Sequence, residues 1–289
     1  MIIPERLAAN CRKSPAREAW LHSLPAMLKD LTERWSLRPG PPFDHGDISC
    51  SWVAMVSRAD GKSAVLKLGM PHMEGAQEIE GLRFWNGDPT VQLLEGDDER
   101  GAMLLEHCQP GSMLRSEPED KQDEVIAALL KRLWRRSASP AGLHRFRHLS
   151  EMLRVWRGET LARVRDWPDA GLVTEGLRVL EELATPSPAD TLLATDLHAG
   201  NVLRSEREPW LVIDPKPFIG DRAYDLVQHL HNCEKRLQAD PMGMVRRLAE
   251  LAELDIDRLR LWTFARAAAD PRDDWSNLVW MDIARALVP

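Results

Sequence analysis

The sequence predicts an α+β fold with a β-rich N-terminal lobe and a mainly helical C-terminal lobe. Strand-like runs gather between residues 43 and 108, where one helical pattern interrupts them. Helical patterns prevail from residue 120 to the end, apart from short β-like pieces within residues 191–213. Strand-rich segments followed by helix-rich segments are typical of an α+β or two-lobed architecture, and 289 residues are enough to bury its core.

The N-terminal segment, residues 1–42, is predicted to be a helical extension. It ends in Arg38–Pro42, which we interpret as a rigid connector because proline fixes its own backbone torsion. The predicted lobes follow as residues 43–108 and residues 109–289.

Hydrophobic periodicity predicts the individual elements. Asp60 and Gly61 favour a hairpin between the first two strands, and Asn86 with Gly87 ends the first helix after them. The predicted strands cover residues 51–57, 64–68, 91–94, 102–106, 191–194, 202–203 and 210–213. The predicted helices cover residues 74–85, 124–136, 149–166 and 174–184, and helices resume from residue 225.

The composition excludes several classes of protein. Acidic residues outnumber basic ones by 45 to 38, a net charge of −7, which disfavours nucleic-acid binding and suits a cationic small molecule. No apolar run approaches the ~20 residues of a membrane span, and no signal-peptide pattern is present. The four cysteines form no zinc motif or disulfide framework. We expect a cytoplasmic protein that binds neither membranes nor nucleic acid, and its oligomeric state stays open.

The strongest chemical motif begins at Asp196 and Leu197, continues to Asn201 and reaches Asp214 after an apolar strand. This is the spacing of a protein-kinase catalytic loop and its later metal-binding aspartate. Phosphoryl transfer needs a carboxylate that accepts the proton of the substrate hydroxyl, and oxygen ligands that hold magnesium. The alternative is an ordinary polar turn, which the same residue types also favour.

A lysine in an apolar strand supports phosphoryl transfer. Lys67 matches the strand-borne lysine that contacts the phosphates of the nucleotide, and Glu78 lies in the next helix, where its partner is expected. The alternative is a lysine on the exposed face of an edge strand. Residues 46–51 occupy the place of a glycine-rich loop without its glycines, so phosphate binding there would depend on backbone N–H groups and on Ser49 or Ser51.

Residues 196–203 and 212–225 resemble the aminoglycoside and hydroxyurea antibiotic phosphotransferases, and within them the streptomycin 6-phosphotransferase branch. Residues 78–87, 91–94 and 102–111 resemble the same branch in order and spacing, so the similarity covers about residues 47–270. The resemblance implies a bilobal protein-kinase-like fold. It also implies transfer of the γ-phosphate of ATP to a small-molecule hydroxyl, with Mg²⁺ as cofactor.

The resemblance implies a role for each residue that matches the family motif. Asp196 becomes the catalytic base, Asn201 and Asp214 the magnesium ligands, and Lys67 with Glu78 the ion pair that orients the phosphates.

Further residues follow from the same resemblance. The segment from Glu106 to Cys108 becomes the hinge at the end of the N-lobe, where backbone groups bind the adenine, and Asp225 braces the catalytic loop. The acceptor lies on the C-terminal lobe in this family, with an ordinary solvated loop as the alternative for its acidic segment. The candidate acceptor-binding residues are Asp273, Asp274 and Trp275.

Two departures from the family pattern change the site. The family reads His-Gly-Asp at the loop, whereas Ala194 and Thr195 precede Asp196 here, so one supporting side chain is missing. The kinase Asp-Phe-Gly reads Asp-Pro-Lys, and its Lys216 either adds positive charge near the phosphates or is a solvated surface lysine.

The sequence therefore predicts a small-molecule kinase that phosphorylates a hydroxyl of a cationic, streptomycin-type aminoglycoside and so inactivates the antibiotic. Two alternatives remain. The first is a kinase of a small metabolite such as a sugar or an amino alcohol, and the second is a noncatalytic nucleotide-binding protein of the same fold.

Overall fold

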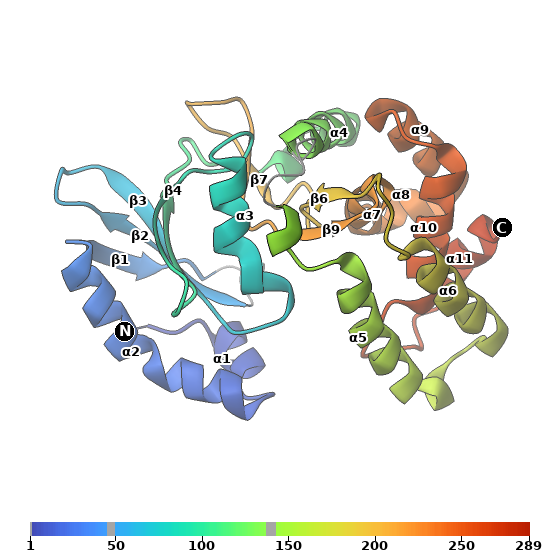
Figure 1. Cartoon of the computed structure of the whole chain (residues 1–289), viewed down its shortest axis with the longest axis horizontal. Coiled ribbons are helices and arrows are strands. Elements are labelled where there is room, and N and C mark those ends of the chain that lie inside the picture. The colour runs from blue at the N-terminus through green and yellow to red at the C-terminus, as the bar shows by residue number, and fades with distance from the viewer. Residues whose placement is uncertain (1, 45–49, 137–142) are drawn as a thin grey trace. The chain divides into compact units, whose positions relative to one another are not determined.

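The computed structural model describes residues 2–44, 50–136 and 143–289 (Figure 1). The described residues divide into two compact units. Unit 1 contains those of residues 1–112 together with 203–213, and unit 2 contains those of residues 113–202 and 214–289. Residues 203–213 therefore belong to unit 1, although they lie far along the chain from the rest of that unit. The sequence did not predict this return.

Unit 1 is built around a five-stranded antiparallel sheet in the order β1-β2-β3-β5-β4. Gly61 turns the hairpin between β2 and β3 with a φ of 80°, a left-handed conformation that glycine adopts without steric penalty. The strands are β1 (Arg38–Pro42), β2 (Ser51–Ser57), β3 (Ser63–Gly69), β4 (Leu93–Asp97) and β5 (Ala102–Glu106). The predicted hairpin and the strand at residues 102–106 are confirmed, and β4 begins two residues later than predicted.

The sheet of unit 1 sends alternate side chains into two hydrophobic clusters. Leu66 of β3 packs in a cluster with Leu24 of α2, whereas its neighbour Val65 packs in a cluster with Leu82 of α3. The next residue on the Val65 side is Lys67, which therefore faces α3. The helices of this unit are α1 (Glu5–Cys11), α2 (Pro15–Arg34) and α3 (Glu78–Trp85), shown in Figure 1.

The interpretation of residues 38–42 as a connector is wrong. They form β1, which pairs with β2 through Pro39 opposite Val56. A proline cannot donate to a neighbouring strand, but an edge strand has a neighbour on one side and tolerates it. Leu24 of the predicted extension shares a hydrophobic cluster with Trp52 of β2, so these helices complete the core of unit 1.

Unit 2 is mainly helical, and α10 lies at its centre in contact with α6, α7, α9 and α11. The unit also contains a short sheet in which β6 pairs with β9, a strand that the sequence did not predict. The helices are α4 (Glu119–Arg136), α5 (Leu149–Ala162), α6 (Ala170–Leu183), α7 (Arg222–Asn232), α8 (Glu234–Ala239), α9 (Pro241–Ala252), α10 (Ile256–Ala269) and α11 (Val279–Leu287). The strands of this sheet are β6 (Thr191–Leu193) and β9 (Phe218–Gly220). The chain also forms β7 (Val202–Leu203) and β8 (Leu211–Val212), which pair with each other, and β8 belongs to unit 1. Short 3₁₀ helices lie at Glu74–Gln77, Leu114–Ser116, Leu143–Arg145 and Val164–Asp166.

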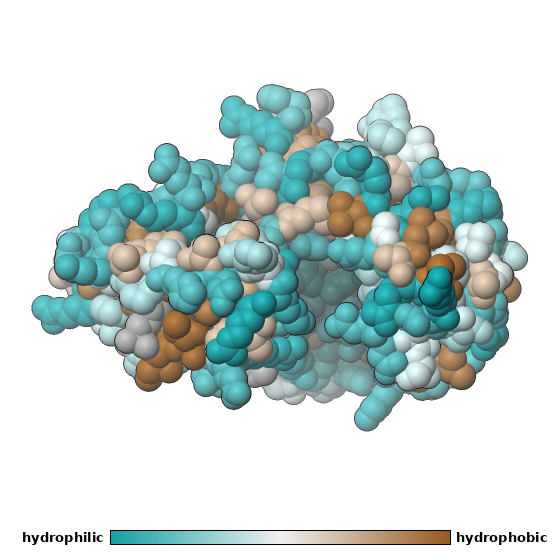
Figure 2. All heavy atoms as spheres, turned by 90° about the horizontal axis from the view of Figure 1, so that it is seen from below, coloured by the Kyte–Doolittle hydropathy of each residue, from teal (hydrophilic) through white to brown (hydrophobic). Residues whose placement is uncertain are grey.

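The surface is polar where Figure 2 shows it, with hydrophobic side chains in small, separate patches. Among the helices described, none combines the length and the apolar character needed to cross a membrane.

Candidate active site

The catalytic-loop motif lies in unit 2, directly after β6. Asp196 is held from two directions. The side-chain amide of Gln228 donates to its Oδ1 over 2.8 Å, and Nδ2 of Asn201 donates to its backbone oxygen over 2.9 Å. The nitrogen of the Asn201 side-chain amide thereby holds the loop backbone at Asp196. The oxygen of the same amide is not used in this hydrogen bond.

Asp225 on α7 anchors the start of this loop. Its carboxylate accepts hydrogen bonds from the backbone N–H groups of Ala194 over 3.1 Å and Thr195 over 2.6 Å. It also accepts one from the indole of Trp134 over 3.0 Å, and its side chain is fully buried. These contacts fix the backbone that leads into Asp196.

Thr195 has a strained backbone. Its φ of 48° lies in the left-handed region, which costs a residue other than glycine roughly 1 kcal/mol or more. Two hydrogen bonds hold it there, because its N–H donates to Asp225 and its hydroxyl donates to the backbone oxygen of Lys216 over 2.6 Å. Thr195 occupies the position of the glycine in the His-Gly-Asp of the resembled family.

The environment of Asp196 makes it a stronger base than an exposed aspartate. Its pKa is raised to about 6, chiefly by burial and in part by the charge of Asp214, while Lys216, Gln228 and Arg266 oppose the rise. A carboxyl group with this pKa is mostly ionised at neutral pH and still accepts a proton readily. It suits the role of a general base.

The oxygen donors beside this loop fit magnesium. The amide oxygen of Asn201 and the carboxylate of Asp214 are hard ligands of the kind that Mg²⁺ prefers, with phosphate and water completing its shell. Lys216 forms an ion pair with Asp214 and is 8% exposed, so its interpretation as a solvated surface lysine is wrong. Asp214 itself has a φ of 54°, a second strained residue at this site.

Unit 1 holds the other predicted pair. The Lys67 ammonium contacts both oxygens of Glu78, over 2.6 and 2.8 Å, and the residues are 7% and 4% exposed. β3 lies between β2 and β5, so the alternative of an exposed edge-strand lysine is wrong. The pair joins the sheet to the first turn of α3.

The side chains of the predicted hinge residues contact other protein groups. The carboxylate of Glu106 pairs with Arg207 over 2.8 Å and accepts the backbone N–H of Gln92 over 3.0 Å. Cys108 is buried, and desolvation raises the pKa of its thiol to about 11, which leaves it unreactive. Binding of adenine by the backbone groups of residues 106–108 stays a prediction. Ser49, the predicted phosphate-binding serine, lies outside the described residues.

The predicted acceptor residues follow α10. Asp273 and Asp274 are exposed, and Asp274 accepts hydrogen bonds from the N–H and hydroxyl of Ser276. Trp275 is 4% exposed and lies beneath the guanidinium of Arg272 at 4.6 Å. Contact of these residues with an acceptor stays a prediction.

Sequence reasoning missed two residues next to Asp196, namely Gln228 and Arg266. A signal for each was present. Gln228 follows Asp225 by one helical turn, so both side chains leave α7 on the same side. Arg266 is the charged residue within residues 261–269, which are apolar apart from Thr263.

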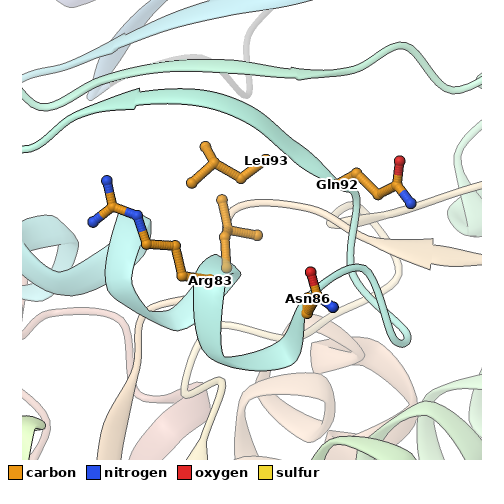
Figure 3. Close-up of a pocket in the computed structure, with 5 residues that line it drawn as sticks. Arg83, Asn86, Gln92 and Leu93 are labelled. Carbon is orange, nitrogen blue, oxygen red and sulfur yellow. The ribbon is translucent and has the colours of Figure 1, made fainter.

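A small pocket of about 190 Å³ in unit 1 has a lining unsuited to phosphoryl transfer (Figure 3). Leu82 and Arg83 lie on α3 and Asn86 directly follows it, while Gln92 directly precedes β4 and Leu93 begins it. This lining contains no carboxylate or other base, so it supplies no phosphotransfer site.

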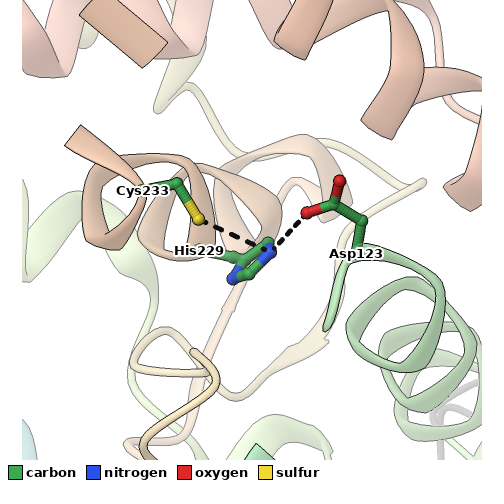
Figure 4. A group of neighbouring side chains, drawn as sticks. All are labelled: Asp123, His229 and Cys233. Atoms are coloured by element: carbon green, nitrogen blue, oxygen red, sulfur yellow. Dashed lines mark hydrogen bonds and ion pairs between the residues drawn. The ribbon is translucent and has the colours of Figure 1, made fainter. Parts of the chain in front are cut away.

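A polar cluster in unit 2 has the residue types of a metal site (Figure 4). His229 contacts Asp123 over 3.0 Å and Cys233 over 3.9 Å. However, Arg236 and Arg247 also donate to the carboxylate of Asp123, over 2.7 and 2.8 Å. Because these guanidinium groups already satisfy the carboxylate, the cluster is a buried ion-pair network that joins α4 to α7, α8 and α9.

Replacing Asp123 with alanine is expected to lower the free energy of unfolding by about 3 kcal/mol or more, because it leaves buried positive charge uncompensated. Burial lowers the pKa of His229, but its hydrogen bond to Asp123 outweighs this and raises the pKa from 6.5 to about 9. The stabilisation from His229 is therefore complete below pH 6.5 and declines as pH rises through about 9.

Urea unfolding across this pH range measures both effects, and Asp120→Ala is the matched control because Asp120 is exposed on the same helix. A loss under about 1 kcal/mol, or a decline at alkaline pH that persists in Asp123→Ala, would contradict the assignment.

Known proteins are similar to this chain in sequence and in fold. A family model described as aminoglycoside/hydroxyurea antibiotic resistance kinase matches residues 34–272. A streptomycin 6-kinase of Streptomyces glaucescens is 38% identical over 273 residues, covering 91% of this chain and 88% of that protein. A hydroxyurea phosphotransferase of Kitasatospora aureofaciens is 38% identical over 255 residues, covering 87% of this chain and 73% of that protein.

Solved structures of small-molecule kinases share the architecture. The structure of a spectinomycin phosphotransferase in complex with ADP and spectinomycin has a TM-score of 0.54 at 13% identity, covering 91% of this chain and 94% of that one. At this identity the comparison concerns the fold, which is the α+β, protein-kinase-like fold expected from the sequence.

Proposed function

Because the chain belongs to the aminoglycoside/hydroxyurea antibiotic resistance kinase family, we propose that it transfers the γ-phosphate of ATP to a hydroxyl of a streptomycin-type aminoglycoside. The family and its relatives make it an antibiotic phosphotransferase that acts on a small molecule. The streptomycin-type acceptor, ATP, Mg²⁺ and a cytoplasmic location are the finer parts of the proposal.

The observation that carries the proposal is the placement of Asp196. It lies on a loop fixed by Asp225 and Asn201, and burial raises its pKa to about 6. As the acceptor oxygen forms its bond to the γ-phosphorus, Asp196 takes the hydroxyl proton, and the bond to ADP breaks with its electrons on the departing phosphate oxygen.

The remaining site residues bind and orient. Lys67 would contact the phosphates of the nucleotide, and Glu78 would hold its ammonium in place. Asn201 and Asp214 would hold magnesium, which when bound neutralises charge on the phosphates.

Two observations favour streptomycin over hydroxyurea as the acceptor. The match spans 88% of the streptomycin 6-kinase and 73% of the hydroxyurea phosphotransferase, at equal identity. The net charge of −7 also suits an acceptor that carries positive charge.

The test is a phosphorylation assay with purified protein, ATP and Mg²⁺. The acceptors are streptomycin, hydroxyurea, ethanolamine and glucose, and mass spectrometry with ³¹P NMR identifies the product and the modified hydroxyl. We expect phosphorylated streptomycin with the phosphate at the 6-hydroxyl. Phosphorylation of only hydroxyurea, or of only an uncharged sugar, would overturn the proposed acceptor.

A further inference from the structure

Gln228 is hydrogen-bonded to both Asp196 and Arg266. Its Nε2 donates to Oδ1 of Asp196 over 2.8 Å, and its Oε1 accepts from both terminal nitrogens of Arg266, each over 3.2 Å. The amide therefore links the carboxylate in the catalytic loop to a guanidinium on α10.

Arg266 determines which end of the amide faces the base. The two ends of a glutamine amide are alike in shape, but one donates and the other accepts. With Arg266 on one side, only the oxygen can face the guanidinium, because the nitrogen would bring two donors together. The nitrogen is thereby turned toward Asp196, where it contributes the donor that an ionised carboxylate needs.

Arg266 is itself held rigidly. It is 4% exposed, and its Nε and Nη2 contact Oδ2 of Asp270 over 2.9 and 2.8 Å. Its guanidinium carbon also lies 5.0 Å from the ring centre of Tyr224 and 5.5 Å from that of Trp156. A group fixed on three sides can fix the amide that it contacts.

The same helix provides both supports of the loop. Asp225 and Gln228 are three residues apart on α7, so their side chains leave the helix on the same side. Asp225 holds the backbone before Asp196, and Gln228 holds its carboxylate.

We propose that Gln228, oriented by Arg266, is a positioning residue for phosphoryl transfer that engages Oδ1 of Asp196 and leaves Oδ2 to accept the hydroxyl proton. The inference rests on the proposed function, in which Asp196 is the base. Gln228 touches no reacting atom and acts through Asp196.

The proposal makes the ionisation of Asp196 sensitive to residue 228. Charged and titratable groups face Asp196 from three segments: Asp214 and Lys216 after β8, Tyr224 on α7, and Arg266 on α10. Lys216 and Arg266 stabilise the ionised form, and the Asp214 charge opposes it. Removing the amide donor leaves these charges in place, so a change in titration reports the lost hydrogen bond.

The experiment compares Gln228→Met with Gln238→Met, since Gln238 is exposed on α8 and distant in sequence from the loop. Methionine is close to glutamine in size and has no donor. We expect the acid limb of kcat against pH to move up by about one pH unit in Gln228→Met, with a loss of about fivefold at pH 6 and little change in KM. Gln238→Met is expected to match the parent protein.

A second readout does not depend on the acceptor. In protein labelled with ¹³C at the aspartate carboxyl carbons, the signal of Asp196 is identified by its loss in Asp196→Asn. Its titration midpoint is expected to rise in Gln228→Met and to rise further in Gln228→Glu, where a second carboxylate would replace the donor. An unshifted midpoint together with unchanged kcat in Gln228→Met would overturn the inference.

The two proposals fail differently. If Asp196→Asn phosphorylates the acceptor at the parental rate, the proposed function is wrong, whatever the titration shows. If Asp196→Asn is inactive while Gln228→Met keeps both the parental rate and the parental titration, the function stands and the positioning role is wrong.

Discussion

Asp196→Asn is expected to lower kcat for phosphoryl transfer by about 10²- to 10⁴-fold, the usual contribution of a general base. Asparagine keeps the size of the side chain but cannot take a proton. Binding of ATP is expected to persist, because the substitution leaves Lys67 and Glu78 untouched. Steady-state kinetics and a thermal-shift titration with ATP and Mg²⁺ measure the two effects separately.

The matched control is Asp257→Asn, since the side chain of Asp257 is 82% exposed on α10. The parent protein is expected to lose activity as the pH falls through about 6, because Asp196 becomes protonated there. A parental rate in Asp196→Asn, or a rate that stays flat from pH 8 to pH 5, would contradict the assignment of the base.

Lys67→Met is expected to abolish detectable turnover and also to lower the free energy of unfolding by about 3–5 kcal/mol. The stability loss arises because Glu78 is 4% exposed and would lose the lysine that pairs with it in this buried position. The activity loss arises because the cation that orients the phosphates is gone. Urea unfolding and the phosphorylation assay measure the two losses.

A double variant separates the two roles of this ion pair. Lys67→Met with Glu78→Leu removes both charges and is expected to recover most of the stability without recovering turnover, because an apolar pair of similar volume can replace a buried ion pair. Lys62→Met on the exposed β2–β3 turn is the control. Recovery of turnover in the double variant would show that Lys67 serves the fold alone.

Much of the candidate site could be predicted from the spacing of residues that lie close together in the sequence. Asp196 and Asn201 lie in the loop between β6 and β7, and Asp214 follows β8, so the three residues fall within the short segment 196–214. Lys67 could be predicted as a site residue because a cation in an apolar strand needs a partner. Glu78 follows it by eleven residues and lies on α3, the helix that Lys67 faces.

The features that could not be predicted depend on packing between segments distant in the sequence. Gln228 and Arg266 lie on different helices, and only the packing of α10 against α7 brings them together next to the base. Lys216 also has contacts distant in sequence, since its backbone is hydrogen-bonded to Ala194 and Thr195. β1 was missed because a run of prolines ordinarily ends regular structure, whereas an edge strand asks little of its backbone N–H groups.

The left-handed backbone of Thr195 has a consequence for the order of folding. A threonine in an isolated segment disfavours this conformation, so the loop gains its stable shape only when Asp225 and the backbone of Lys216 are in place to hold it. We therefore expect the loop to form after α7 has docked onto β6, late in the folding of unit 2. A partly folded chain with its helices already formed would still lack an aspartate held ready to take a proton.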